Sequence, residues 1–419
     1  EPQPTSAWTP TTTHGETCGF KRRICSACSA VSGLNSGSSP GIVSGVACTG
    51  FTAVDVGISW DLPATETICS YGAFPAKPTI ISTNPHNPQI CGSGDRANPY
   101  ADADSGNDNA YMLQPDIQSL PCYLHGEYAT LGTAKISVLD RGFIFGDGIY
   151  EVIPVYGGRP FRLDHHLARL ERSLAEVRMV NPLARRAWIG IVAELVQRLS
   201  RQSGRPVAEQ DHLIYIQITR GVAPRDHVMP QGLQPTVFVM ITPMKQPSES
   251  QRRDGVSCLS LDDFRWRKGH IKSTSLLAAV LARQHSADAD AVETILLRDG
   301  FLTEASASNV WVVRHGQVLG APRDNLVLEG IRYGLIESLC QQLNIPFALR
   351  RISRDEVFEA DEVLLSSATK EILSVVRIDD HRIGAGRPGP LGQRLHAAYR
   401  AAVTTQPDLH TLLAQGDAA

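Results

Sequence analysis

The sequence predicts an α/β protein with two domains, which follow a long segment of different composition. From about residue 112 to residue 405, amphipathic helical patterns and short alternating strand patterns follow one another, and this succession is typical of mixed α/β folds. A length of 419 residues allows about two or three domains, and a polar stretch around Pro247 marks a linker. We therefore expect a low-complexity extension, a small α+β domain, a linker, a larger domain and a tail, with the boundaries 1–111, 112–243, 244–250, 251–405 and 406–419.

Residues 1–111 are rich in Ser, Thr, Gly, Pro and Ala, and contain only five Lys or Arg and nine Asp or Glu. Such a composition cannot bury enough apolar surface to offset chain entropy, so we expect this segment to be disordered or loosely structured. The first methionine of the chain is Met112. This suggests that the native protein begins near Met112 and that the upstream residues are a non-native extension. A regulatory or targeting arm is the alternative.

Composition also narrows the partners and the compartment. The net charge of −3 gives no reason to expect nucleic acid or an anionic membrane as partner, and no apolar run approaches the roughly 18 residues that a membrane span needs. Six of the nine cysteines precede residue 112, where Cys25 and Cys28 form a lone CxxC without the second pair of a zinc site. We expect no metal. The three later, widely spaced cysteines favour a reducing compartment, the cytoplasm.

The small domain begins with a loop that contains three glycines. Strand-like residues 135–139 and 149–156 flank the sequence Leu139-Asp-Arg-Gly-Phe-Ile-Phe-Gly-Asp-Gly148, and a hairpin turn is expected at Gly157-Gly158. The glycines permit positive φ and close backbone approach. Their spacing is not GxGxxG and no βα crossover follows, so a dinucleotide site is a weak interpretation.

Helix and strand patterns complete this domain. The expected helices are 163–177 and 183–199, and the expected strands are 212–220 and 236–242. Asp164 can cap the first helix. Arg169 lies beside the apolar stripe of the same helix. On local evidence it is either a solvated arginine or a ligand for an anion.

The strand at 212–220 ends in the loop Thr219-Arg-Gly-Val-Ala-Pro-Arg225-Asp-His227-Val-Met-Pro230. Arg225 and His227 stand two residues apart and can both reach one anion. Arginine offers a planar fork that matches a carboxylate, and histidine adds a second donor. An ordinary polar loop is the alternative.

The larger domain contains the lysine around which the sequence is organised. A polar and basic run from Arg265 ends at Ile271 and is followed by Lys272. Apolar residues then recur at helical spacing at Leu276, Leu277, Val280 and Leu281, so we expect a helix that buries this face. A partly desolvated lysine at the start of such a helix can act as an amine nucleophile. A solvated surface lysine is the alternative.

Three further features of this domain could belong to a site. Glu304 lies among small residues between two apolar strands, where it is either paired with a cation or solvated. A helix is expected to open at Gly330-Ile331 and to run to about Leu343, and the free amides of such an opening can bind phosphate. The sequence Ser366-Ser-Ala-Thr369 follows a strand and is a second possible phosphate site. An ordinary helix start and an ordinary turn are the alternatives.

Together these motifs resemble the class IV aminotransferases, which are pyridoxal-phosphate enzymes of fold type IV, and among them the bacterial D-amino-acid aminotransferases. The resemblance covers residues 120–403. The motifs that carry it are Asp140-Arg-Gly-Phe-Ile-Phe-Gly-Asp-Gly-Ile-Tyr-Glu151, the Thr-Arg-Gly…Pro-Arg-Asp-His loop, Ile271-Lys272-Ser and Leu302-Thr-Glu304…Ser308-Asn309-Val310. It implies a small α+β domain, a larger barrel-like α/β domain, a cleft between them, and a homodimer whose partner loop helps to close the pocket.

The resemblance also implies roles for single residues. Lys272 would attach the cofactor and then carry a proton between it and the substrate Cα, and Glu304 would keep the pyridine nitrogen protonated. Cofactor binding would involve Arg169, Lys272, Glu304, Leu328, Ile331, Arg332, Ser367, Ala368 and Thr369. The substrate carboxylate would be bound by Tyr150, Arg225 and His227. The implied reaction moves an amino group from a D-amino acid to a 2-oxo acid, 2-oxoglutarate or pyruvate.

The chain departs from the family pattern at a few positions. Arg332 stands where the family often has threonine, and its side chain could contact the phosphate or point away. Ala368 stands where a hydroxyl is common, and Ala305 stands where the family often has glycine. On the same fold, aminodeoxychorismate lyase and branched-chain L-amino-acid aminotransferase are the rival functions. A non-catalytic protein is a third alternative, but it would be expected to lack Lys272 or Glu304.

Overall fold

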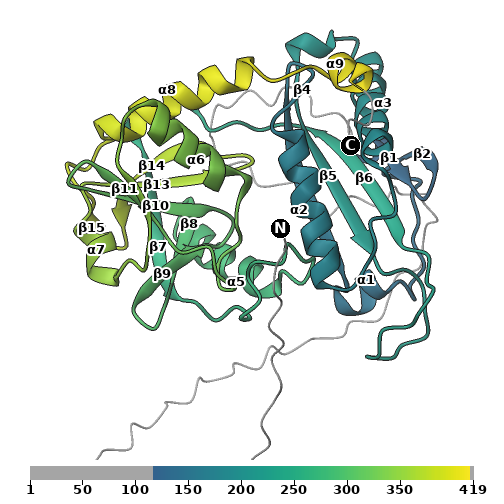
Figure 1. Ribbon diagram of the computed structural model, residues 1–419, viewed down its shortest axis with the longest axis horizontal. Coiled ribbons are helices and arrows are strands. Elements are labelled where there is room, and N and C mark those ends of the chain that lie inside the picture. The colour runs from purple at the N-terminus through teal and green to yellow at the C-terminus, as the bar shows by residue number, and fades with distance from the viewer. Residues whose placement is uncertain (1–116, 416–419) are drawn as a thin grey trace, which may run out of the picture. The chain divides into compact units, whose positions relative to one another are not determined.

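The computed structural model describes residues 117–415, which lie within one compact unit of residues 103–419. The expectations for residues 1–111 lie outside the described residues. Two β-sheets with helices packed against them make up the described part of the chain, which confirms the predicted mixed α/β fold (Figure 1). No helix within residues 117–415 is long and apolar enough to cross a membrane.

The first sheet has six antiparallel strands in the order β2-β1-β6-β5-β3-β4. Its strands are β1 (Pro121–Leu124), β2 (Glu127–Thr130), β3 (Gly148–Tyr156), β4 (Arg159–Pro160), β5 (Asp211–Thr219) and β6 (Thr236–Pro243). In β5, Ile214, Ile216 and Ile218 are buried and alternate with half-buried residues, as expected for a sheet that packs helices on one face.

Two long helices cover that face. They are α2 (Leu163–Glu176) and α3 (Arg185–Ser203), and their apolar stripes share one core cluster with the buried isoleucines of β3 and β5. Both helices were predicted. The N-cap of α2 is Arg162 rather than Asp164, because the chain turns through a left-handed conformation at Arg162 and Asp164 already lies in the first helical turn.

The second sheet has nine strands, in the order β12-β11-β10-β13-β14-β7-β8-β9 with β15 paired to β14. Its strands are β7 (Val256–Asp262), β8 (Glu293–Arg298), β9 (Phe301–Ala305), β10 (Asn309–Arg314), β11 (Gln317–Gly320), β12 (Phe347–Leu349), β13 (Glu362–Ser367), β14 (Glu371–Ile378) and β15 (His381–Arg382). The pairs β7–β8, β7–β14 and β11–β12 are parallel and the others are antiparallel.

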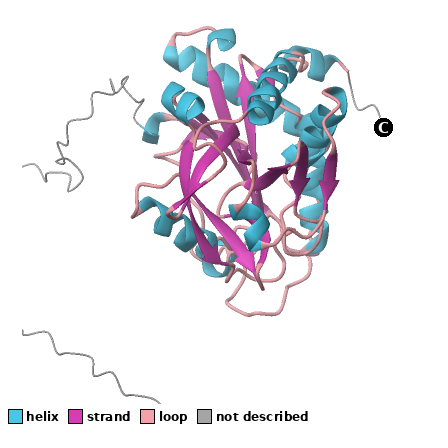
Figure 2. Ribbon diagram, turned by 90° about the vertical axis from the view of Figure 1, so that its left-hand side faces the viewer, coloured by secondary structure: helices cyan, strands magenta, loops and turns pink. Residues whose placement is uncertain are grey.

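Both faces of this sheet are buried. In β10, Trp311 and Val313 belong to one core cluster, whereas Val310 and Val312 belong to another. The first cluster includes side chains of α6 (Ile331–Gln342) and α8 (Pro390–Thr404). Figure 2 shows the helices around the strands. Burial on both faces explains why these strands read as continuous apolar runs.

After α8 the chain returns to the first sheet. Leu409 and Leu412 of α9 (Leu409–Ala414) lie in the core cluster of α2 and α3, and Figure 1 shows α9 beside α3. The remaining helices within residues 117–415 are η1 (Ile117–Ser119), α1 (Arg141–Phe145), η2 (Val207–Glu209), α4 (Glu249–Asp254), α5 (Leu277–Ala287) and α7 (Arg354–Phe358).

Two further local expectations are wrong. Residues 135–139 form no strand and are mostly exposed, and part of the glycine loop that follows is the short helix α1. The apolar face of α5 is not buried by residues 117–415, since Leu277 is 73% exposed and Val280 is 57% exposed. Helical spacing predicted this helix correctly, but the spacing does not say what covers its apolar side.

Candidate active site

Lys272 lies at the free edge of β3. The amide of Tyr150 donates to the carbonyl of Lys272 at 3.0 Å, the amide of Thr274 donates to the carbonyl of Gly148 at 3.0 Å, and Ile149 and Ser273 form a bridge between them. The segment that precedes α5 is therefore fixed to the first sheet. The half-buried side chain places Nζ 4.1 Å from the centre of the Tyr150 ring.

Glu304 lies in β9 and is buried. One carboxylate oxygen accepts from Arg265, and the other accepts from the amide of Leu328 at 3.2 Å and from Asn309 Nδ2 at 3.3 Å. Arg265 also donates to Asp263 at 2.8 Å. The structure thus resolves the question that the sequence left open, because Glu304 is paired with a cation.

Burial nevertheless raises the pKa of Glu304 to about 7, despite the opposing charge of Arg265. Arg265 is shared with Asp263, which is itself buried. The positive charge of Arg265 is therefore divided between the carboxylates of Glu304 and Asp263. A further cation beside Glu304 would stabilise the ionised carboxylate.

Arg169 is buried in α2 and faces β3. Its Nε and Nη2 donate to the two oxygens of Glu151 at 2.7 and 2.8 Å, and its Nη1 donates to the carbonyl of Glu329 at 3.2 Å. His166 Nδ1 lies 2.7 Å from the same carboxylate. The charge of Arg169 and these hydrogen bonds hold the pKa of Glu151 well below its usual range, although burial alone would raise it. Arg169 has five N–H groups, so two remain for a ligand.

The contact between Arg169 and Glu329 brings Arg169 to the start of α6. This helix begins at Ile331, and its N-cap Gly330 provides no side-chain cap. A side chain at position 330 would collide with Asn309, so glycine is needed for this approach. The uncapped first turn leaves amide groups free to bind an anion.

The Ser367-Ala368-Thr369 turn connects β13 to β14, and its residues are half-buried. The hydroxyls of Ser367 and Thr369 lie 3.5 Å apart, and Ser367 accepts from the amide of Lys370 at 3.1 Å. Lys370 Nζ donates to the buried Glu293 at 2.8 Å. This buried ion pair fixes the turn to β8.

The side chain of Arg332 points away from the first turn of α6. It donates to the hydroxyl of Tyr399 at 3.0 Å and packs over the rings of Phe161 and Tyr399 at 4.8 and 5.2 Å. Of the two alternatives that the sequence left open for Arg332, the structure has the second. Leu328 contributes its amide to Glu304 and its carbonyl to Asn309.

Arg225 and His227 are not brought to Lys272 by any contact within residues 117–415. Both are exposed and lie against Phe145 at the end of α1, with Arg225 5.6 Å and His227 5.4 Å from the ring centre. Arg141 holds their loop by donating to the carbonyl of Asp226. Tyr150 instead stacks on Tyr215 at 5.7 Å.

Sequence reasoning missed several residues of this site. A signal for the contacts of Glu151 with His166 and Arg169 was present in the sequence. Glu151 is a charged residue in an apolar strand, and His166 and Arg169 stand three apart on one helical face. No comparable signal joined Arg265 to Glu304 or Lys370 to Glu293, since these pairs are distant in sequence and meet only in the folded sheet.

The comparison with known proteins agrees with this geometry. Residues 148–378, which hold most of these groups, match the family Amino-transferase class IV. The chain belongs to this family. Among curated relatives, the D-alanine aminotransferase of Bacillus licheniformis is 36% identical over 282 residues, which cover 67% of this chain and 96% of the relative. The D-alanine aminotransferase of Staphylococcus haemolyticus is 33% identical over 66% of this chain and 95% of that relative.

Solved structures give the same family and fold. A T.th. branched-chain amino acid aminotransferase with pyridoxamine 5′-phosphate is 26% identical, with a TM-score of 0.61 over 69% of this chain and 95% of that chain. The chain is therefore an aminotransferase of fold type IV, and its cofactor is pyridoxal 5′-phosphate. The described residues fit this cofactor, because they offer an amine at Lys272, a buried carboxylate at Glu304 and an arginine at the uncapped start of α6.

Proposed function

We propose that the protein transfers an amino group from a D-amino acid, such as D-alanine, to a 2-oxo acid, either 2-oxoglutarate or pyruvate. The observation that carries this proposal is the 36% identity to a D-alanine aminotransferase across 96% of the length of that relative. The Arg225/His227 loop supports it chemically, because it offers two donors for a carboxylate. Specificity within the family depends on few side chains, so this is a proposal about substrate and not about reaction type.

In the proposed site, Lys272 is the catalytic residue. Its amine holds the cofactor covalently and carries the proton to or from the substrate Cα. Bound pyridoxal 5′-phosphate supplies an electron sink for the electrons of the broken Cα–H bond. Glu304 would pair with the ring nitrogen and keep it protonated, and Leu328 would pack against the ring. Arg169, the backbone of Ile331 and Arg332, and Ser367, Ala368 and Thr369 would hold the phosphate.

The substrate carboxylate is bound by Arg225 and His227, with Tyr150 on the side of the lysine. Arg225→Ala should raise KM for D-alanine by about ten-fold to a hundred-fold, since a charged hydrogen bond contributes roughly 1.5–3 kcal/mol. KM for an amine without a carboxylate should not change. Arg205→Ala is a control on another exposed loop of the same domain. Equal effects on both substrates would contradict the role of Arg225.

We propose a homodimer in which the Arg225/His227 loop of one subunit reaches the Lys272 side of the other. Within residues 117–415, Arg225 and His227 contact Phe145 rather than Lys272 of their own chain. Exposed apolar residues also occur on the loop, on α1, in the segment that carries Lys272 and on α5, and such faces commonly mark interfaces. They include Phe143, Val228, Trp266, Leu277, Val280 and Leu281. A Leu277→Arg/Val280→Arg variant should sediment as a monomer and lose activity; an active monomer would refute the arrangement.

A branched-chain L-amino-acid aminotransferase is the second candidate, favoured by the 26% identity to the T.th. branched-chain enzyme. One assay separates these functions and the third, aminodeoxychorismate lyase. D-alanine, L-leucine and aminodeoxychorismate are offered separately to the purified protein, with 2-oxoglutarate present as amino acceptor, and oxo acid, pyruvate or aminobenzoate is measured. The proposal predicts turnover with D-alanine at least about 100-fold above L-leucine, and preference for either other substrate would replace it. Cytoplasmic localisation stays a prediction.

A further inference from the structure

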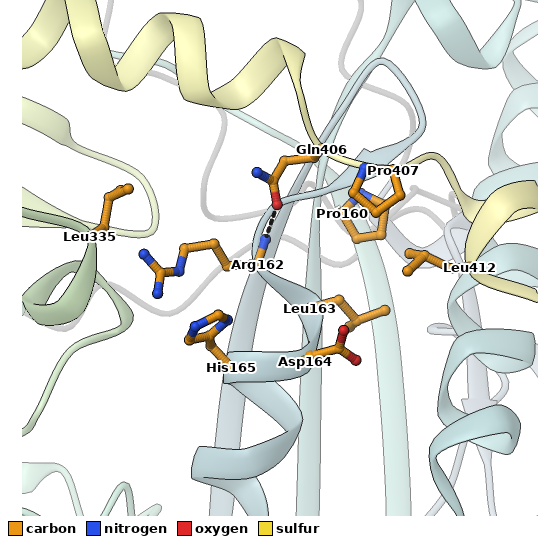
Figure 3. Close-up of a pocket in the computed structure, with 9 residues that line it drawn as sticks. All are labelled: Pro160, Arg162, Leu163, Asp164, His165, Leu335, Gln406, Pro407 and Leu412. Carbon is orange, nitrogen blue, oxygen red and sulfur yellow. Dashed lines mark hydrogen bonds between the residues drawn. The ribbon is translucent and has the colours of Figure 1, made fainter. Parts of the chain in front are cut away.

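A pocket of about 260 Å³ lies at the start of α2, apart from the residues assigned to the cofactor. Three distant parts of the chain line it: the β4–α2 corner, α6, and the segment that follows α8 together with α9. Figure 3 shows the guanidinium of Arg162 extended toward Leu335 of α6, with the ring of His165 beside it and Gln406 above. The amide of Arg162 donates to Gln406 Oε1 at 3.0 Å.

Arg162 has no carboxylate partner within residues 117–415, and its buried Nε–H makes no hydrogen bond. Its guanidinium lies against the first turns of α6, because a side-chain carbon added at Gly334 would be 3.6 Å from Nη2. Burial and the nearby charge of Arg332 both lower the pKa of Arg162. The side chain is half-buried, and a cation that loses part of its hydration without a counter-charge is in an unfavourable position.

Arg332 adds to the same imbalance. It is only 2% exposed, its Nε–H has no partner, and the described part of the chain gives it no carboxylate. The hydroxyl of Tyr399 and two aromatic faces are its polar contacts. The two arginines therefore place neighbouring positive charges at the contact of α2 with α6, and a bound anion would compensate them.

The rest of the pocket decides which kind of anion fits. Leu163, Leu335 and Leu412 form apolar walls, which a bare inorganic anion would leave without contact. Asp164 also lines the pocket, but Arg185 donates to it at 2.7 Å, and Figure 3 shows it on the side away from the Arg162 guanidinium. No side chain caps α2, so the first-turn amides and the helix dipole add positive potential.

We propose that this pocket binds a small organic carboxylate, with the carboxylate on Arg162 and a short apolar chain against Leu163 and Leu335. The planar guanidinium matches a carboxylate. The volume is below the roughly 300–1,000 Å³ of drug-sized sites, so the ligand has only a few carbon atoms. Both 2-oxo acids derived from amino acids and unrelated short carboxylic acids have a carboxylate on a short apolar chain. The bound acid joins the β4–α2 corner to α6, the helix that begins at the proposed phosphate site.

The test measures binding of 4,4,4-trifluorobutanoate to the cofactor-loaded protein by ¹⁹F NMR and needs no turnover. The background variant is Arg225→Asn, which removes the proposed carboxylate contact of the active site. Arg162→Asn is added to remove the charge. Asparagine tolerates positive φ and caps helices well, so α2 is expected to keep its start. Arg159→Asn is the matched control, since Arg159 is an arginine of the same corner that already has a carboxylate partner, Asp408.

The expected result is saturable binding in the background and in the Arg159 variant, and binding at least about ten-fold weaker in the Arg162 variant. The neutral amide of the same probe should bind at least about ten-fold more weakly than the acid. Equal affinity in the Arg162 variant, equal affinity of acid and amide, or no saturable binding in the background would each overturn the proposal. Isobutyrate and pyruvate as competitors then distinguish an unrelated short acid from a 2-oxo acid.

Discussion

Glu151 and Glu304 are both buried and both hydrogen-bonded to an arginine, yet their acidities move in opposite directions. The pKa of Glu151 is far below its usual range, whereas the pKa of Glu304 is raised to about 7. Glu151 receives two donors from Arg169 and one from His166, all within 2.8 Å. Glu304 shares its arginine with Asp263, and its other donors are 3.2 and 3.3 Å away.

This difference in pKa gives the two glutamates different roles: the charge of Glu151 is fixed, whereas the charge of Glu304 can change. Glu151 is ionised under all ordinary conditions, so it holds Arg169 in place. Glu304 lies near its titration point, so its charge depends on what stands beside it. A protonated ring nitrogen would draw Glu304 into the ionised form and would be stabilised by it in turn. Burial alone does not decide the state of a carboxylate; the charge and distance of its donors do.

Lys272→Ala should have the largest effect on activity of all the substitutions compared here. The amine of Lys272 is required whether or not Glu151 and Glu304 are intact. Turnover of D-alanine should fall by more than about 10⁴-fold, and borohydride should no longer fix the cofactor to the protein. Lys268→Ala, an exposed lysine of the same segment, should behave as wild type. Substantial activity in the Lys272 variant would contradict the catalytic role.

Glu304→Gln should cost activity rather than stability. Loss of the charge opposite the ring nitrogen should lower kcat/KM by roughly 10²- to 10³-fold. Arg265 keeps Asp263, so the free energy of unfolding at pH 8 should not fall. Steady-state kinetics and urea denaturation measure the two quantities. A variant that is unstable but fully active would reverse the assignment.

Glu151→Gln is the matched substitution and should have the opposite profile. It leaves the buried charge of Arg169 without its counter-ion, so the protein should lose about 3–5 kcal/mol of stability. The affinity for pyridoxal 5′-phosphate should weaken because Arg169 is no longer fixed. Fluorescence titration of the cofactor-free protein measures this affinity. Wild-type stability in this variant would end the distinction between the two glutamates.

The pH dependence of stability gives a finer comparison. In the cofactor-free protein the folded state holds the Glu304 proton up to about pH 7, whereas the ordinary pKa is 4.5. The contribution of Glu304 to the unfolding free energy should therefore fall as pH rises between these values, by about 3 kcal/mol. Urea denaturation of wild type and Glu304→Gln at pH 5, 6, 7 and 8 gives this contribution as their difference.

The difference is needed because histidines titrate in the same range. The pKa of His166 is lowered to about 4 from its ordinary 6.5, mainly by burial, and it contributes stability that increases with pH. His212 behaves in the same way. Both contributions cancel between wild type and variant. A flat difference across this range would show that Glu304 is already ionised without cofactor. Adding cofactor should make the difference between wild type and Glu304→Gln less dependent on pH.

Local pattern predicted many of the elements but not their partners. Helical periodicity predicted α2 and α3. Period-two alternation gave β5. The sequence could not reveal that β7 pairs with β14 across more than a hundred residues, because strand pairing is set by packing at long range.

The site followed the same rule. Lys272, Arg169 and Glu304 were selected from motifs, and their roles remain proposals. The structure added the network of Glu151 and His166 around Arg169, and that of Arg265 and Asp263 around Glu304. These partners were invisible because a side chain's neighbours depend on tertiary contacts. The prediction that the apolar face of α5 is buried was wrong for a related reason. Periodicity shows which side of a helix is apolar, but not which residues pack against that side.

The two main-chain hydrogen bonds that join Lys272 and Thr274 to β3 have a mechanical consequence. They join the segment that carries Lys272 to the edge of the first sheet, which is built from the earlier half of the described chain. Any motion that keeps both bonds leaves the backbone of Lys272 in place beside β3, so the reach of its amine changes through the side chain alone.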